Sequence, residues 1–315
     1  MRPKIVFMGT PDFAVSSLDA LCKAGCDVAA VVTVPDRPTG RGLKLTFSPV
    51  KSYALEHSIE VLQPERLRDE AFLARLQAIG ADMFVVVAFR MLPQCVWAMP
   101  RLGTFNLHAS LLPQYRGAAP INWAIINGET TTGVTTFLLN ERIDEGRILL
   151  QESTPITPAD TAGTMHDRLA EIGCRLVVTT VEGLADGTLT PTEQPSFATL
   201  YGAPKIFKQD CAIDWNSAGR DIVNFVRGLS PYPAATMAMK NEKGEILSFK
   251  VYDVAYETDA NSVKGTVTTD KKRWLKIGIT DGYINILSLQ LSGKRKNSVD
   301  EFLRGYDVSN WSLVC

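Results

Sequence analysis

Residues 5–34 read IVFMGTPDFAVSSLDALCKAGCDVAAVVTV, and this stretch decides the expected fold. Residues 5–8 are a short apolar run, which is typical of a strand buried on both faces of a parallel sheet. A proline–aspartate start signal precedes an amphipathic pattern over residues 13–23, and Gly25 provides a stop signal. A second apolar run covers residues 28–34. The order strand, helix, strand predicts a parallel β–α–β unit.

The same alternation continues to about residue 184. Further strands are predicted over residues 59–62, 83–88, 104–107, 133–139 and 147–150, and helices over residues 50–57, 69–78, 120–126 and 161–184. This alternation predicts a Rossmann-like, doubly wound α/β domain with a mainly parallel sheet. Ligand chemistry in such sheets takes place at the carboxyl ends of the strands.

The last third of the chain has a different pattern. A helix is predicted over residues 217–227, followed by the short runs 235–239, 246–254, 265–267, 274–279 and 283–291. Short strands separated by turn signals predict a small β-barrel. We therefore expect a first domain over residues 1–189, a linker over residues 190–208 and a barrel domain over residues 209–315.

Composition excludes several classes of protein. The chain has 315 residues, is 45% hydrophobic and carries a net charge of −1, so it has no global basic field that would drive binding to nucleic acid. Its six cysteines form no Cys-x-x-Cys pair, so neither a zinc site nor a disulfide scaffold is expected. The first residues do not resemble a signal peptide, and no apolar run reaches membrane-spanning length. These features favour a cytoplasmic protein with no membrane partner.

The turn after residues 5–8 reads GTPDF and has one glycine where the dinucleotide-binding fingerprint has three. We therefore expect no nicotinamide or flavin cofactor.

Residues 105–117 read FNLHASLLPQYRG and carry the densest group of reactive side chains. In an extended strand alternate side chains share a face, so Asn106, His108 and Ser110 are expected to point the same way. An amide donor beside an imidazole suits acyl-group chemistry, in which one group holds an oxyanion and the other handles a proton. The alternative is that His108 is a hydrogen-bonded core residue, and residue chemistry alone leaves both open.

Two other segments are candidates for function. Asp144 follows the predicted strand 133–139 and is a natural carboxylate partner for His108, although Asp-Glu-Gly is also common in solvated turns. Residues 35–49 form a long connection that carries Arg37, Arg41 and Lys44. Such a loop is a candidate basic arm for a phosphate backbone, and a solvated surface loop is the alternative. Basic clusters at residues 271–273 and 294–296 are consistent with RNA contacts or with a solvated surface.

These features together resemble a known family over the whole chain. Residues 106–113 (NLHASLLP) followed by residues 115–117 (YRG) resemble the signature of formyltransferases that use 10-formyltetrahydrofolate. The stretch GTPDFA at residues 9–14, the insertion DRPTGRG at residues 36–42 and the appended small barrel narrow the resemblance to the methionyl-tRNA formyltransferase family.

The resemblance implies a role for each candidate residue. Asn106, His108 and Asp144 would form a catalytic trio, and the folate site would be lined by Ser110, Leu111, Leu112 and Pro113. The tRNA-binding residues would be Arg37 and Arg41 in the insertion and Lys44 just after it, with further contacts from an OB-like barrel. The reaction would move a formyl group from 10-formyltetrahydrofolate to the α-amine of methionine on initiator methionyl-tRNA, for translation initiation. No metal is implied, and a monomer that binds the acceptor arm of the tRNA is expected.

The chain departs from the family pattern at two places. It has Phe89-Arg90 where the family usually has an aromatic residue and a glycine, and Glu145 where the family often has threonine.

Two rival functions are also consistent with part of the sequence. One is a 10-formyltetrahydrofolate-dependent formyltransferase that acts on a small amine, such as a nucleotide sugar or a ribonucleotide. The other is a noncatalytic RNA-binding protein.

Overall fold

The computed structural model describes residues 2–39 and 44–314. The chain forms two compact units, and each is assembled from three separate segments. Unit 1 consists of Met1–Gly117, Thr132–Thr154 and His166–Gly202, and unit 2 of Ala118–Thr131, Pro155–Met165 and Ala203–Cys315. Segments 118–131 and 155–165, which were expected in the first domain, are therefore grouped with the C-terminal part of the chain.

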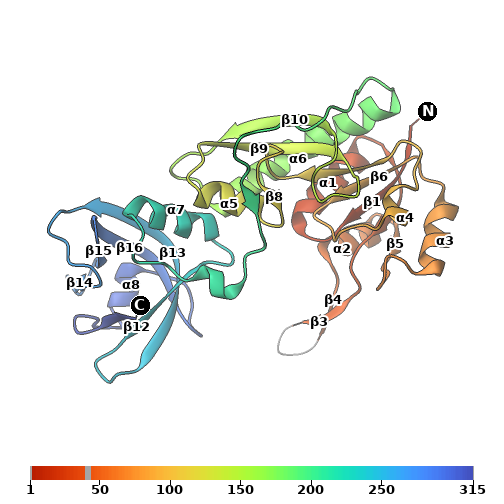
Figure 1. Cartoon of the computed structure of the whole chain (residues 1–315). Helices are drawn as coiled ribbons and strands as arrows, with labels where there is room; N and C mark the ends of the chain where they lie inside the picture. The colour runs from red at the N-terminus through yellow and green to blue at the C-terminus, as the bar shows by residue number, and fades with distance from the viewer. Residues whose placement is uncertain (1, 40–43, 315) are drawn as a thin grey trace. The chain divides into compact units, whose positions relative to one another are not determined.

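Unit 1 is built on a seven-stranded sheet with the strand order β10-β9-β7-β6-β1-β2-β5 (Figure 1). The strands are β1 (Lys4–Gly9), β2 (Asp27–Val32), β5 (Glu60–Leu62), β6 (Met83–Val87), β7 (Thr104–His108), β9 (Thr131–Leu138) and β10 (Ile148–Pro155). The pairs β1–β2, β1–β6, β2–β5 and β6–β7 are parallel, whereas β9 runs antiparallel to β7. The prediction of a Rossmann-like, mainly parallel sheet is confirmed.

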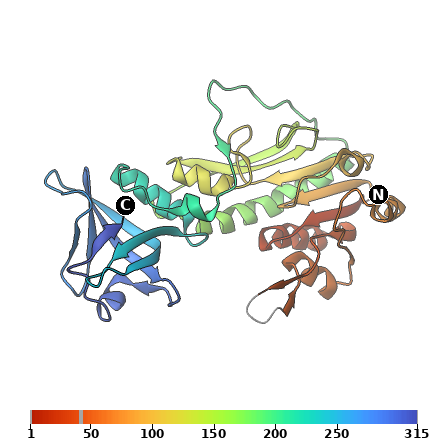
Figure 2. The same ribbon diagram turned by 60° about the horizontal axis from the view of Figure 1, so that its bottom comes forward.

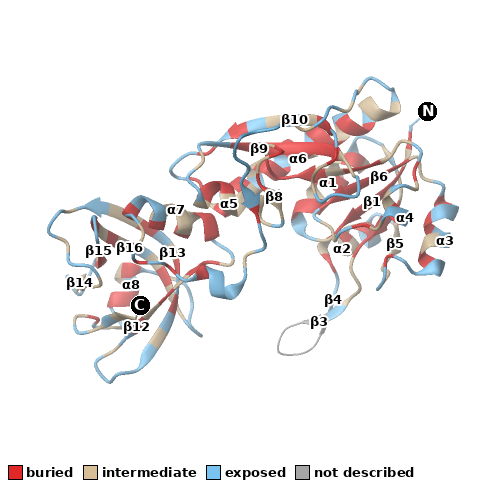
Figure 3. Cartoon of the chain, viewed as in Figure 1, coloured by how far each residue is buried: buried red, intermediate tan, exposed pale blue. Residues whose placement is uncertain are grey.

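The central strands are apolar because both of their faces are covered. Every residue of β6 is buried, and all of β1 after Lys4 is buried as well (Figure 3). The covering helices include α1 (Asp12–Lys23), α2 (Pro49–Glu56), α3 (Glu70–Ile79) and the short α4 (Gln94–Trp97). Asp69 caps α3 by accepting a 2.9 Å hydrogen bond from the backbone N–H of Phe72, which satisfies one of the free donors at the start of the helix.

The long helix α6 (Ala162–Ala185) contributes its residues from His166 onward to unit 1, where it lies along one face of the sheet (Figure 2). The hydroxyls of Thr180 on α6 and Thr136 on β9 are 2.9 Å apart. A Cβ atom on Gly173 would lie 2.7 Å from Leu107 on β7, so glycine permits the close approach of helix and sheet. The close approach of α6 at Gly173 thus supports β7, the strand that carries the candidate site.

The insertion expected as a loop contains two short antiparallel strands, β3 (Arg37–Thr39) and β4 (Lys44–Thr46). Pro38 pairs with Leu45 across this hairpin. A three-residue strand has no measurable alternation, which is why the sequence pattern did not indicate it. Arg41 lies outside the described residues, and so does the side chain of Lys44.

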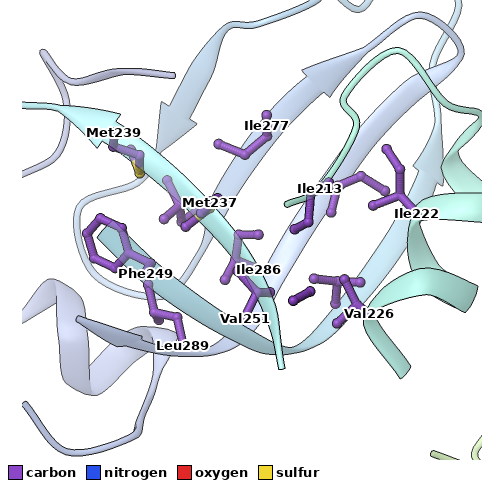
Figure 4. Packing of buried hydrophobic residues seen from close by; sticks show 14 of the residues in the cluster. Ile213, Ile222, Val226, Met237, Met239, Phe249, Val251, Ile277, Ile286 and Leu289 are labelled. Carbon is purple, nitrogen blue, oxygen red and sulfur yellow. The ribbon is translucent and has the colours of Figure 1, made fainter. Parts of the chain in front are cut away.

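Unit 2 is centred on an antiparallel sheet with the order β14-β15-β16-β13-β12-β18. Its elements are α5 (Pro120–Ile126), the 3-10 helix η1 (Lys208–Cys211), α7 (Gly219–Leu229), β12 (Ala235–Lys240), β13 (Ile246–Thr258), β14 (Val267–Thr269), β15 (Leu275–Ile279), β16 (Gly282–Leu291), β17 (Asn297–Ser298), α8 (Val299–Leu303) and β18 (Ser312–Val314). Figure 4 shows side chains such as Phe249, Val251 and Ile286 of the sheet packed in one hydrophobic cluster with Val226 of α7. The predicted small barrel is confirmed.

Several short elements were not predicted from the sequence. They are α4, β8 (Arg116–Gly117), β11 (Gly202–Ala203), η1, β17, α8 and β18. Each covers two to five residues, too few for a hydrophobic period to be recognised. Within the part of the chain that the structure describes, no helix is long and apolar enough to cross a membrane.

Candidate active site

Strand β7 carries two of the three candidate catalytic side chains, and its pairing fixes their direction. Asn106 is placed opposite Phe137 of β9, and His108 opposite Thr135. Asn106 is half-buried, and within residues 2–39 and 44–314 its amide makes no side-chain hydrogen bond. An unpaired amide at the carboxyl end of a parallel strand is free to bind a ligand atom.

The hydrogen-bond partners of His108 assign its neutral form. The imidazole is 6% exposed, and its Nε2 lies 2.9 Å from the backbone carbonyl oxygen of Tyr115. A carbonyl oxygen only accepts, so Nε2 carries the hydrogen and donates it. The other nitrogen, Nδ1, keeps the lone pair and lies 3.9 Å from Oδ2 of Asp144. The basic nitrogen of His108 therefore faces the carboxylate.

Asp144 has an unusual backbone conformation and accepts two hydrogen bonds from other segments, and a third reaches Gly146 in the same turn. Its φ angle is +54°, in the left-handed region that favours glycine. Its Oδ2 accepts a 2.9 Å hydrogen bond from the backbone N–H of Gly117. The side-chain amide of Gln194 donates to the backbone oxygens of Asp144 and Gly146, both at 2.8 Å. The structure thus brings Asp144 to His108 across 36 residues (144 − 108) of sequence, as the resemblance implied.

Gln194 belongs to the expected linker and was not identified from the sequence. Besides holding the Asp144 turn, its Oε1 accepts a 2.7 Å hydrogen bond from Nη2 of Arg116. Arg116 also forms an ion pair with Glu145, at 3.0 Å. A glutamine in a polar, proline-containing segment gives no local signal, because its role depends on contacts that span about 50 residues. Glu145, which was noted as a departure from the family pattern, serves as the partner of this arginine.

Ser110 lies beyond the strand from which its shared face with Asn106 and His108 was predicted. Strand β7 ends at His108, so the period of two ends there as well. The Ser110 side chain is fully buried, and its hydroxyl donates a 2.6 Å hydrogen bond to the backbone oxygen of Gln114. Ser110 therefore closes the turn that follows the strand instead of presenting its hydroxyl beside the imidazole.

The other residues of that turn are anchored by Thr135 and Gln151. The backbone N–H of Leu112 donates to Oγ1 of Thr135 at 3.1 Å, and its backbone oxygen accepts from the amide of Gln151 at 2.8 Å. Leu112 and Pro113 are buried and Leu111 is half-buried. These hydrogen bonds hold the turn that follows His108. Its role as the folate-lining segment stays a prediction.

Arg90, at the other departure from the family pattern, ties two loops of unit 1 together. Its guanidinium donates to the backbone oxygens of Pro64 and Glu65. Burial lowers the pKa of this guanidinium, and the neighbouring positive charge of Arg37 lowers it further. Arg37 is exposed at the start of β3. The candidate arm thus begins beside the loop that follows β6.

Among the described residues, no group of three or more His, Cys, Asp or Glu side chains is placed to hold a metal ion. The side chains brought together at the end of β7 are the amide of Asn106, the imidazole of His108 and the carboxylate of Asp144. This arrangement can donate a hydrogen bond to a developing oxyanion and accept one proton beside a carboxylate.

Comparison with known proteins assigns the family. The family model for formyl transferase matches residues 3–181, and the model for the formyl transferase C-terminal domain matches residues 205–307. The methionyl-tRNA formyltransferase of Bacteroides thetaiotaomicron is 50% identical over 311 residues, which cover 98% of this chain and 97% of that protein. That of Parabacteroides distasonis is 52% identical over 309 residues, covering 96% of this chain and 95% of that protein.

Two solved structures share the fold at low sequence identity. WlaRD, a sugar 3N-formyl transferase crystallised in the presence of dTDP and 5-N-formyl-THF, aligns with a TM-score of 0.64 and 19% identity, covering 94% of this chain and 100% of that one. HypX from Aquifex aeolicus in complex with tetrahydrofolic acid aligns with a TM-score of 0.61 and 18% identity, covering 100% of this chain and 51% of that one.

Proposed function

This chain belongs to the methionyl-tRNA formyltransferase family, and we propose that it formylates the free α-amine of methionine on initiator methionyl-tRNA. The formyl donor in this proposal is 10-formyltetrahydrofolate, and the product is N-formylmethionyl-tRNA for translation initiation. The observation that carries the proposal is the identity of about half of all residues with relatives of that name over both units.

The donor supplies a formyl carbonyl group, and Asn106 is the residue placed to bind its oxygen. As the amine attacks the carbonyl carbon, negative charge develops on the oxygen, and the Asn106 amide N–H donates a hydrogen bond to it. The amide has no competing side-chain partner within residues 2–39 and 44–314, so it needs no rearrangement to act. Donors of this kind contribute roughly two to three powers of ten in rate.

His108 accepts the proton that the attacking amine loses. The proton goes to Nδ1, because Nε2 already donates its hydrogen to Tyr115. The imidazolium that forms has Nδ1 3.9 Å from Oδ2 of Asp144, so the carboxylate stabilises its charge. Asp144 keeps this position because Gly117 and Gln194 bind it from two sides. The tetrahedral intermediate then collapses as the bond between the formyl carbon and N10 of the folate breaks, and N10 takes up a proton, so tetrahydrofolate leaves and the formyl group stays on the amine.

The segment that would hold the folate is the turn formed by Ser110, Leu111, Leu112 and Pro113. A folate combines a flat heterocycle with polar edges, and small-molecule sites of that kind are mostly apolar with a few fixed polar groups. The turn fits this description because it is apolar and is anchored through Thr135 and Gln151. In this proposal, a folate held by the turn would bring its formyl group to the Asn106 amide.

We assign the tRNA to two basic surfaces. The first is the β3–β4 arm with Arg37, Arg41 and Lys44. The second is a cleft of about 420 Å³ within unit 2, whose lining includes Lys205, Lys208, Lys250, Phe207 and Tyr232. Lysines attract the phosphate backbone, and exposed aromatic rings provide stacking surfaces for unpaired bases. Tyr232 is 80% exposed and Phe207 is 51% exposed, so both rings are accessible.

The deciding experiment measures formyl transfer from 10-formyltetrahydrofolate to charged initiator tRNA. Elongator methionyl-tRNA and free methionine serve as controls, and we expect transfer to the initiator alone. The rival formyltransferase function predicts transfer to a nucleotide sugar or ribonucleotide amine instead, so these amines are tested in parallel. Absence of transfer together with absence of folate-analogue binding would favour a noncatalytic RNA-binding protein.

All of the catalytic groups named here come from one unit of one chain, and we propose that the enzyme acts as a monomer in the cytoplasm. Light scattering at the enzyme concentration of the assay measures the mass directly. A dimer with full activity would contradict the monomer proposal and leave the assigned chemistry unchanged.

A further inference from the structure

The two ends of the β3–β4 arm are joined by a polar cluster that the proposed chemistry does not use. Lys51 on α2 is the centre of this cluster, and its side chain is 13% exposed. Its Nζ donates to Oδ2 of Asp36 at 2.5 Å and to Oε1 of Gln63 at 2.8 Å. Asp36 directly precedes the arm, and Gln63 directly follows β5. We call Asp36, Lys51 and Gln63 the arm clamp.

Gln63 closes the arm clamp into a ring. Its Nε2 donates to Oδ1 of Asp36 at 2.8 Å and to the backbone oxygen of Val34, also at 2.8 Å. Both carboxylate oxygens of Asp36 are therefore occupied. The hydrogen bond from Lys51, followed by that from Gln63, lowers the pKa of the Asp36 carboxyl. A carboxylate bound at both oxygens loses most of its rotational freedom, so the segment that enters the arm has a fixed direction.

The segment that leaves the arm is bound to the same lysine. Nζ of Lys51 lies 4.1 Å from the centre of the Phe47 ring, a cation–π distance. Ser48 caps α2 by accepting from the backbone N–H of Lys51 at 3.1 Å, and its hydroxyl is 2.7 Å from that of Thr33. Both strands of the arm are thus held to α2 and to the carboxyl ends of β2 and β5.

We infer that Asp36, Lys51 and Gln63 are positioning residues that set the direction of the β3–β4 arm for the acceptor tRNA. The inference rests on the proposed function, because it gives the arm a tRNA to bind. None of the three belongs to the trio of Asn106, His108 and Asp144. A clamp at the root of a hairpin fixes the direction in which its strands leave the domain, so a small rotation at Asp36 would turn β3, which follows it directly. Misplacement of a binding group by about 1 Å can cost up to about a hundredfold in rate.

The test replaces Lys51 by methionine, which keeps the length and apolar stem of the side chain and removes the charge and the donors. The matched control is Lys23→Met, which removes a lysine that pairs with Asp19 on α1 at 2.7 Å and does not touch the arm. We expect Lys51→Met to raise KM for methionyl-tRNA about tenfold or more, a magnitude set by the loss of charged hydrogen bonds. We expect kcat at saturating tRNA and KM for the folate to stay within about twofold.

Two further variants separate positioning from general damage. Gln63→Met is expected to raise KM for tRNA in the same way as Lys51→Met. Lys51→Arg is expected to have a KM for tRNA close to that of the wild type, because arginine keeps a positive charge and hydrogen-bond donors. Thermal midpoints are measured for each variant. A parallel rise of KM for tRNA and for folate, or a fall in kcat alone, would contradict the inference. Unchanged tRNA kinetics in both Lys51→Met and Gln63→Met would overturn it.

The wild-type enzyme in the same assay separates this inference from the proposed function. If the wild type does not formylate methionyl-tRNA, the proposed function fails and the inference fails with it. If the wild type formylates methionyl-tRNA and the clamp variants match it, only the inference fails.

Discussion

At the scale of single residues, the chemistry open to the site depends on which side-chain nitrogen and oxygen atoms already have hydrogen-bond partners. His108 donates through Nε2 to the carbonyl oxygen of Tyr115, which leaves Nδ1 facing Asp144, and the Asn106 amide has no side-chain hydrogen bond within residues 2–39 and 44–314. Asp144 uses Oδ2 for Gly117, and the same atom lies nearest to the imidazole. Among the described residues, Asn106 and His108 therefore carry the groups available to a ligand, whereas the carboxylate of Asp144 faces the imidazole of His108.

Removal of the Asn106 donor tests this assignment. Asn106→Ala is expected to lower kcat by about 10²- to 10³-fold with a smaller effect on KM for tRNA, because the hydrogen bond strengthens as the oxyanion forms. Asn106→Asp, which has nearly the same shape but no N–H donor, should be impaired at least as much. Steady-state formylation kinetics measure both variants. Turnover near the wild-type level in either one would contradict the assignment.

Gln194 offers a second prediction at this scale, because it positions Asp144 without facing the imidazole. Gln194→Ala removes two hydrogen bonds to the Asp144 turn and is expected to lower kcat by about tenfold. The matched control is Gln114→Ala, whose side chain binds Thr199 and Tyr201 of the same segment and does not touch Asp144. An equal loss in both variants would mean that the segment matters only as a whole.

At the scale of elements, the sequence predicts the strands and helices that show a run or a period of apolar residues. It does not predict segments whose structure depends on contacts with distant residues. The strands β1 and β6 are continuous apolar runs, and the helices α1 and α6 are long enough for burial to leave a repeating pattern. Helix α8 is defined by a capping box between Ser298 and Glu301 over five residues, so no period is visible. The linker around Gln194 is irregular by composition, yet long-range hydrogen bonds fix it to the site. A pattern reports which face of an element is buried, and it does not report which atoms meet across the chain.

The turn that precedes β18 gives a prediction about pH. Hydrogen bonds from the side chain and backbone of Ser309, together with Lys271, lower the pKa of Asp307 to about 2. A lowered carboxyl pKa means that the folded state prefers the charged form. Its contribution to stability is present above the unfolded pKa of about 4 and is lost as the pH falls through about 2.

Asp307→Asn is therefore expected to lower the thermal midpoint at pH 7 and to approach the wild-type midpoint as the pH falls from about 4 towards 2. Thermal unfolding of both proteins over this pH range measures the difference. A gap between the two midpoints that widens in acid would contradict the assigned hydrogen bonds.

At the scale of the whole molecule, the chain does not divide at one point. Segments 118–131 and 155–165 are grouped with unit 2, so α5 is part of that unit although it precedes β9 in the sequence. The side-chain amide of Asn122 on α5 donates a 2.7 Å hydrogen bond to the backbone oxygen of Gly228 on α7. A Cβ atom on Gly228 would lie 2.6 Å from Ile126, so α5 and α7 approach closely. A boundary after residue 189, as expected from the sequence, would therefore leave α5 without the helix on which it packs.

A fragment of residues 1–189 is accordingly expected to fold less stably than the full chain and to bind a hydrophobic dye, because Ile126 loses its apolar neighbours. Full-length Gly228→Val tests the same contact without truncation. Its added side chain must displace Ile126, and overpacking of this kind costs about 1–3 kcal/mol of unfolding free energy. Gly202→Val is the control, because a Cβ atom there meets no atom within 4 Å. If the fragment had the thermal midpoint of the full chain and Gly228→Val matched Gly202→Val, α5 would belong to the catalytic domain, and the chain would divide at the linker alone.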